Sequence, residues 1–146
     1  MNRISAVFES AKGPILNVYA TAGFPKLGDT MTVLEALQEG GADIIEIGMP
    51  YSDPVADGET IQQSNQVSLD QGMTVAYLFE QLKDLRSKVQ VPVLLMGYIN
   101  PVLQFGVEKF CQKCQEVGVD GLILPDLPMA EYELEYQEIF ERYGLF

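Results

Sequence analysis

Two carboxylates stand at a position where an aliphatic stretch gives way to a loop. Glu46 lies inside the apolar run 44–47, and Asp57 lies in the loop 48–58, which is rich in Gly, Pro and Asp. Because burial penalises the charged form of a carboxyl group, we expect Glu46 to exchange a proton near neutral pH. Two carboxylates in different environments can divide the roles of acid, base and electrostatic stabiliser.

Each carboxylate also has a structural interpretation. Glu46 could pair with a basic residue, but no lysine falls on a predicted strand. Asp57 could cap the helix that starts near Glu59, and Asp126, directly after another aliphatic run, could bind substrate or cap a turn. Spacing alone leaves the alternatives for Asp57 and Asp126 open.

The residue types exclude several kinds of chemistry. The chain has no His, so a Ser-His-Asp or Cys-His nucleophile and an imidazole-bound zinc are excluded. The absence of strand lysines argues against a Schiff-base aldolase. Cys111 and Cys114 have the spacing of a redox or zinc pair, but they fall on an apolar helical stripe, which favours core packing. We expect no metal site.

Composition limits the surroundings of the protein. The chain has 146 residues, a net charge of −12 and 47% hydrophobic residues, as in a globular domain. The negative charge argues against nucleic acid or an anionic membrane as a partner, and no apolar run is long enough to span a bilayer. No signal-peptide pattern begins the chain, so we expect a cytoplasmic protein with reduced thiols.

Strands and helices are predicted to alternate along the chain. The predicted strands are aliphatic runs at 15–20, 43–47, 91–96 and 121–124. The predicted helices cover 30–37, 75–85, 107–117 and 130–143. Continuous apolar strands separated by amphipathic helices are typical of an α/β fold with a parallel sheet that is covered on both faces.

An internal repeat refines this prediction. Segment 38–45 resembles segment 115–122: in both, a helix ends at Gly, and an Asp and a strand follow. Repeated units favour a (β/α) barrel, with a doubly wound sheet as the alternative. A barrel needs eight strands, and four are visible. We therefore expect 1–146 to be one domain, the first four or so βα units of a TIM barrel, rather than a complete small α/β domain.

Four segments carry a resemblance to a known family. They are 20–25 (ATAGFP), 45–62 (IEIGMPYSDPVADGETIQ), 96–101 (MGYINP) and 118–128 (GVDGLILPDLP). In this order they resemble the tryptophan synthase alpha chain family. The resemblance implies a (β/α)8 barrel that cleaves indole-3-glycerol phosphate to indole and glyceraldehyde 3-phosphate. It also implies no cofactor in this chain, and an alpha2beta2 assembly with a beta chain that carries pyridoxal phosphate.

The resemblance assigns roles to individual residues. Glu46 and Asp57 match the catalytic pair. Positions expected to contact substrate are Tyr19, Met96 and Ile123, which line a flat indole pocket, and the polar Tyr98 and Asp126. Positions expected to face the beta chain are Asp53, Pro54, Asn100 and Pro101. The alternative function is a catalytically inactive half barrel that acts only in self-association or in binding a beta chain; a sugar-phosphate epimerase would lack the segment 50–58.

Overall fold

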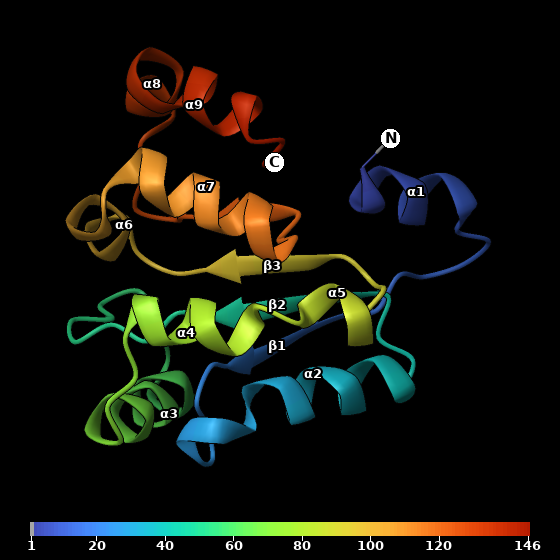
Figure 1. The fold of residues 1–146 in the computed structure, drawn as a ribbon, viewed down its shortest axis with the longest axis horizontal. Helices are drawn as coiled ribbons and strands as arrows, with labels where there is room; N and C mark the ends of the chain where they lie inside the picture. The colour runs from blue at the N-terminus through green and yellow to red at the C-terminus, as the bar shows by residue number, and fades with distance from the viewer. Residues whose placement is uncertain (1) are drawn as a thin grey trace.

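A four-stranded parallel sheet forms the centre of the molecule. The computed structural model describes residues 2–146, and Figure 1 shows the labelled strands side by side with their arrows in one direction. The strand order is β1-β2-β3-β4. The strands are β1 (Asn17–Thr21), β2 (Ile44–Gly48), β3 (Val93–Met96) and β4 (Gly121–Ile123).

Helices occupy the connections between the strands. They are α1 (Arg3–Ser10), the 3-10 turn η1 (Leu27–Asp29), α2 (Thr30–Glu39), α3 (Glu59–Asp70), α4 (Val75–Leu82), α5 (Leu85–Lys88), α6 (Ile99–Phe105), α7 (Val107–Val117), α8 (Met129–Glu131), the π-helical turn η2 (Tyr132–Tyr136) and α9 (Gln137–Arg142). None of the helices between residues 2 and 146 is long and apolar enough to cross a membrane.

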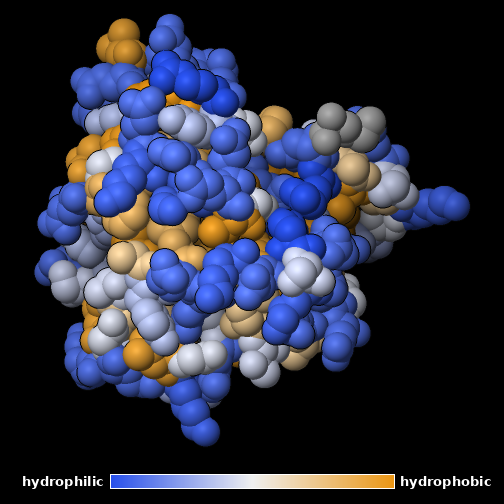
Figure 2. Space-filling model, viewed as in Figure 1, coloured by the Kyte–Doolittle hydropathy of each residue, from blue (hydrophilic) through white to orange (hydrophobic). Residues whose placement is uncertain are grey.

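The sheet presents two unlike faces. Ile45, Ile47, Val93 and Leu95 are at most 1% exposed and belong to the core. Helices α2, α4 and α7 lie across the sheet in Figure 1, and Figure 2 shows that this side of the molecule is mostly hydrophilic, with hydrophobic side chains gathered in a band between helices. Since strand side chains alternate, the opposite face carries Glu46 and its register partners Tyr19 and Leu94.

The strand order distinguishes between the two predicted architectures. A doubly wound sheet reverses its strand order near the middle, whereas a barrel adds each strand beside the preceding one. The observed order follows the sequence from β1 to β4, and each neighbouring pair is parallel. The described strands therefore have the order of a barrel wall.

The internal repeat has a structural cause. Gly41 and Gly118 follow α2 and α7 with φ angles of +95° and +85°, a conformation that favours glycine. The aspartate two residues later then binds the neighbouring strand segment. The Asp43 carboxylate accepts a hydrogen bond from the Leu16 N–H at 2.8 Å, and Asp120 accepts one from the Val93 N–H at 2.9 Å. The repeat thus encodes a helix end and an inter-strand contact.

Cys111 and Cys114 pack in the core, as their place on the apolar stripe of α7 predicts. Both side chains are fully buried, and Phe110 beside them is buried as well. Burial raises the pKa of the Cys111 thiol to about 11 and that of Cys114 further. Both thiols are therefore protonated and unreactive in the folded chain at neutral pH.

Several element boundaries differ from the predictions. Helices α1 and α6 are not among the predicted elements. The stretch predicted as one helix over 75–85 divides into α4 and α5, and the last helix is interrupted by η2. At the end of the described chain, the backbone oxygen of Phe146 accepts a hydrogen bond from the Leu122 N–H at 2.7 Å.

A buried carboxylate connects three parts of the chain at the amino end of the sheet. Asp120 is 5% exposed and accepts hydrogen bonds from Arg86 at 2.6 Å and from Arg3 at 2.9 Å. The Arg86 guanidinium also donates to the backbone oxygens of Gly118, Val89 and Val91. Arg86 therefore holds α5 against both β4 and the segment before β3.

Removing Arg86 should destabilise the fold. Arg86→Met leaves the buried Asp120 charge with only the half-exposed Arg3, so we expect the free energy of unfolding in urea to fall by about 3 kcal/mol. The control is Arg142→Met, because Arg142 and Glu108 are both more than half exposed. Arg142→Met should lower the free energy of unfolding by less than about 1 kcal/mol. Equal losses in the two variants would contradict this assignment.

Candidate active site

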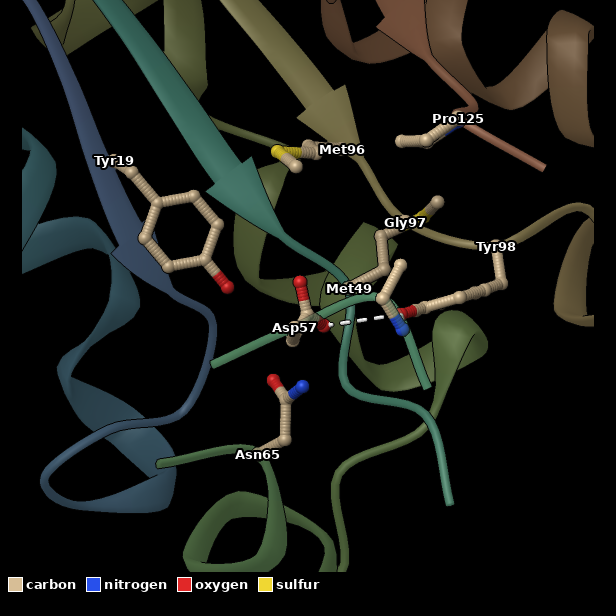
Figure 3. A pocket seen from close by; sticks show the side chains of 9 residues that line it. Tyr19, Met49, Asp57, Asn65, Met96, Gly97, Tyr98 and Pro125 are labelled. Atoms are coloured by element: carbon tan, nitrogen blue, oxygen red, sulfur yellow. Dashed lines mark hydrogen bonds between the residues drawn. The ribbon is translucent and has the colours of Figure 1, made fainter. Parts of the chain in front are cut away.

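A pocket opens at the carboxyl end of the sheet. Its wall is formed by side chains from β1, β3, α3 and the loops after β2, β3 and β4 (Figure 3). The lining residues are Tyr19, Met49, Ala56, Asp57, Asn65, Met96, Gly97, Tyr98 and Pro125. Loops at the carboxyl ends of parallel strands are where α/β barrels place their chemistry, so this pocket is the candidate active site.

Asp57 is held in the pocket by Tyr98. The Tyr98 hydroxyl accepts a hydrogen bond from the Ala56 N–H at 2.9 Å and donates to Asp57 Oδ2 at 3.4 Å. Burial raises the pKa of Tyr98, and the negative charge of Asp57 raises it further. The phenol therefore stays protonated and able to donate. The helix-capping alternative for Asp57 is not observed, because the N-cap residue of α3 is Gly58.

Glu46 lies beside this pocket on the open face of β2. It is half buried, and the side-chain amide of Asn17 donates a hydrogen bond to Glu46 Oε1. Its surroundings are therefore more polar than the aliphatic environment expected from its strand, because its side chain points away from the buried Ile45 and Ile47. No Lys or Arg of residues 2–146 forms an ion pair with Glu46, so the structural interpretation of this residue is not supported.

Tyr19 links the two carboxylates. It pairs in register with Glu46, and its ring forms one wall of the pocket opposite Asp57 (Figure 3). Burial raises the pKa of the Tyr19 phenol, and the negative charges of Asp57 and Glu46 raise it further. Both carboxylates therefore lie close enough to the phenol to influence it.

The predicted substrate positions are brought together only in part. Tyr19, Met96 and Tyr98 line the pocket. Ile123 lies on the same face of the sheet as Glu46, but the register aligns it with Met96 and Gly48, which is two residues beyond Glu46. It is not among the lining residues.

Asp126 lies in the loop after β4 and outside the pocket lining. Its Oδ1 atom accepts a hydrogen bond from the Ile99 N–H, the first residue of α6, at 2.9 Å. This carboxylate therefore satisfies one of the backbone donors that a helix leaves unpaired at its start. Asp126 thus makes a structural contact between two loops, and its contact with substrate stays a prediction.

The residues expected to face a partner lie in the loop after β2 and at the start of α6. Asp53 is exposed and accepts a hydrogen bond from the Ser52 hydroxyl, and Pro54 accepts one from the Asp57 N–H. Asn100 and Pro101 are half buried in the first turn of α6. The Asn100 amide donates to the Tyr51 hydroxyl at 3.1 Å, so the loop after β2 and the start of α6 are directly connected.

Five lining residues were not predicted: Met49, Ala56, Asn65, Gly97 and Pro125. Met49 and Gly97 directly follow strands, and Pro125 comes two residues after β4, so their place after a strand could have indicated them. Asn65 gave no comparable signal, because it lies in the middle of a polar stretch of helix.

The pocket is acidic, and most of its lining is apolar. Asp57 is its charged lining residue, and no Lys or Arg of the described chain lines it. Within residues 2–146, no group of three or more Cys, Asp or Glu side chains could hold a metal ion. The pocket can accept hydrogen bonds and enclose an aromatic ring, but it offers no cationic side chain for a phosphate group.

Comparisons with known proteins agree with this geometry. The family model of the tryptophan synthase alpha chain matches residues 6–145. The tryptophan synthase alpha chain of Flavobacterium psychrophilum is 54% identical over 145 residues, which are 99% of this chain and 57% of that protein. The alpha chain of Parabacteroides distasonis is 52% identical over the same share of this chain. The chain thus spans a little over half the length of the curated relatives it matches.

Solved structures show the same relationship in three dimensions. The crystal structure of tryptophan synthase subunit alpha from Legionella pneumophila superposes with a TM-score of 0.95 at 35% identity, over all of this chain and 57% of that one. Tryptophan synthase from Mycobacterium tuberculosis gives a TM-score of 0.91 at 33% identity, over 99% of this chain and 58% of that one. The four parallel strands correspond to the first half of their TIM barrel. The chain belongs to the tryptophan synthase alpha chain family.

Proposed function

We propose that this chain carries the catalytic carboxylates of an alpha subunit that cleaves indole-3-glycerol phosphate to indole and glyceraldehyde 3-phosphate. The observation that supports this most directly is that Tyr19 has Glu46 as its register partner and shares a pocket with Asp57, at the carboxyl end of a parallel sheet. The shape of the pocket fits a flat ring. Tyr19, Met49 and Met96 supply apolar surface, and the Asp57 carboxylate projects into the same space (Figure 3).

The reaction needs one proton delivered and one removed. Glu46 in its acid form gives a proton to C3 of the indole ring, which makes the ring electron-poor. The hydroxyl on the adjacent side-chain carbon then loses its proton, its electron pair forms the aldehyde C=O, and the C–C bond to C3 breaks. The bonding electrons return to the ring and restore the aromatic indole. A single carboxyl group can serve both transfers, because the ionised Glu46 left by the first step is the base for the second.

Asp57 stabilises the charge that develops during this sequence. Protonation at C3 gives the ring nitrogen a partial positive charge and makes its N–H a stronger donor. A carboxylate that accepts this hydrogen bond therefore stabilises the transition state more than the ground state. The Tyr98 hydroxyl holds one oxygen of Asp57, which leaves the other oxygen free to accept.

The phosphate group and the partner require parts outside this pocket. Since no cationic side chain lines the pocket, we propose that the phosphate binds at barrel loops beyond the four strands described here. We also propose that the loop with Asp53 and Pro54 and the helix start at Asn100 and Pro101 face a beta chain in an alpha2beta2 assembly. In that assembly pyridoxal phosphate belongs to the beta chain, and the lyase step needs no cofactor.

Indole release from indole-3-glycerol phosphate tests the proposal. The chain is assayed alone and mixed with the unmatched C-terminal part of the Flavobacterium psychrophilum relative. Glu46→Gln keeps the side-chain volume but removes the transferable proton, so we expect the rate of indole release to fall by at least about 100-fold.

Glu116→Gln is the matched control. Glu116 is exposed on α7, pairs with Lys113 and does not line the pocket. Its rate should stay within about twofold of the parent. Indole release that survives Glu46→Gln would contradict the catalytic assignment. Release from neither the chain nor the mixture, under conditions where the intact relative is active, would contradict the proposed function.

Gly48 determines whether the Tyr19 ring can lie in the pocket. A Cβ atom at Gly48 would lie 2.8 Å from Tyr19 Cε2 and closer still to the hydroxyl. Gly48→Ala should therefore displace the ring and lower indole release at least tenfold, because small misplacements of a site residue are costly. Gly28→Ala is the control, since a Cβ there meets nothing within 4 Å. Equal rates in these two variants would show that the position of Tyr19 does not matter for turnover.

A further inference from the structure

Asn65 is the buried polar side chain that the folded chain leaves unsatisfied. It lies in the middle of α3, is 3% exposed and lines the candidate active site. Its Oδ1 atom has no hydrogen-bond partner among residues 2–146. A buried acceptor without a partner is costly, and Asn is a weak helix former in a helix interior. Both features are typical of a residue kept for function.

The neighbours of Asn65 on α3 show that this face of the helix is otherwise satisfied. The Ser64 hydroxyl lies 2.7 Å from Thr21 Oγ1, and the fully buried Ser68 hydroxyl donates to the Ala22 carbonyl oxygen at 2.6 Å. These two serines attach α3 to β1. Asn65, which lies between them along the chain, makes no such contact and faces the pocket instead (Figure 3).

The hydroxyl chain beside Asn65 determines which groups face the pocket as acceptors. When the Ser64 proton goes to the Ile61 carbonyl oxygen at 2.9 Å, Thr21 is the donor to Ser64. In this arrangement the Tyr19 hydroxyl, 3.3 Å from Thr21 Oγ1, is the donor to Thr21, and the lone pairs of the Tyr19 oxygen are left for the pocket.

Three acceptor groups therefore meet at one end of the pocket. Figure 3 shows the Asn65 carboxamide pointing toward Asp57, with the Tyr19 hydroxyl beside Asp57. Asp57 receives one hydrogen bond from Tyr98. No residue of the described lining donates a hydrogen bond to Asn65 Oδ1. A ligand that fills this end must bring a donor, or it buries unpaired acceptors.

We infer that Asn65 is a ligand-binding residue that accepts a hydrogen bond from a ring N–H, jointly with Asp57, and so makes the pocket select N–H heteroaromatic rings over N-alkylated ones. This inference rests on the proposed function, because indole is the ring concerned. It extends that function from the catalytic carboxylates to a residue on α3 that no motif indicates.

The test compares indole with N-methylindole as binding probes. Dissociation constants for both are measured by NMR titration of the parent chain and of Asn65→Leu, which has nearly the same shape but no acceptor. The preference for indole is the dissociation constant of N-methylindole divided by that of indole. In Asn65→Leu this ratio should fall about fivefold or more, and N-methylindole should bind at least as tightly as to the parent. The melting temperature of Asn65→Leu should not fall, since the variant removes an unsatisfied buried group. Asn65→Ala removes the acceptor without new bulk and should show the same loss of preference.

Gln66→Met is the control. Gln66 is the next residue of α3, and its exposed side chain donates a hydrogen bond to the Asp70 carboxylate. Its ring preference should equal that of the parent. An unchanged preference in both Asn65 variants would overturn the inference, as would a lower melting temperature with both rings weakened equally. Binding of neither ring by the parent would overturn it too. Ring binding by the parent without indole release counts only against the proposed function.

Discussion

The register of the parallel sheet is the constraint on which the site depends. A slip of one residue would move every strand side chain to the opposite face, and Glu46 would then enter the helix-covered core. Asp43 and Asp120, which come just before β2 and β4, oppose such a slip. The Asp43 carboxylate accepts a hydrogen bond from the backbone N–H of Leu16, next to β1, and the Asp120 carboxylate accepts one from the backbone N–H of Val93 in β3. The backbone N–H groups of the same two aspartates donate to the carbonyl oxygens of Leu16 and Val93. The contact is therefore reciprocal and allows one alignment.

The fixed register divides rigidity and chemistry between the two faces of the sheet. The helix side carries Ile45, Ile47 and Val93, whose burial supplies the apolar contribution to stability. The open side carries Tyr19, Glu46 and Met96, which are all half buried. A polar group there costs less than one in the core, so the same strand can stabilise the fold and present a carboxylate.

Sequence patterns predicted the parts of the fold that depend on local burial. The four strands were visible as aliphatic runs, and Gly41 and Gly118 marked two helix ends by their requirement for positive φ. Side-chain orientation beyond one element was not visible. The contact of Asp126 with Ile99 depends on how two loops meet. Asn65 resembles a solvent-facing helix residue until the packing of α3 on β1 is known. The polar surroundings of Glu46 depend on Asn17, a residue of the neighbouring strand.

The two carboxylates are held by different means, and this difference suits their proposed roles. Glu46 extends from a strand that is hydrogen-bonded on both sides, so its backbone is fixed and its side chain has room to transfer protons. Asp57 lies in an irregular loop, where the backbone alone fixes little. Tyr98 supplies the missing order by binding the Ala56 N–H and Asp57 together, and its ring packs on Tyr51 at 5.2 Å between centroids. A group that must accept one hydrogen bond in a fixed direction needs this support more than a group that exchanges a proton, since preorganised acceptors lose their effect when they can rotate.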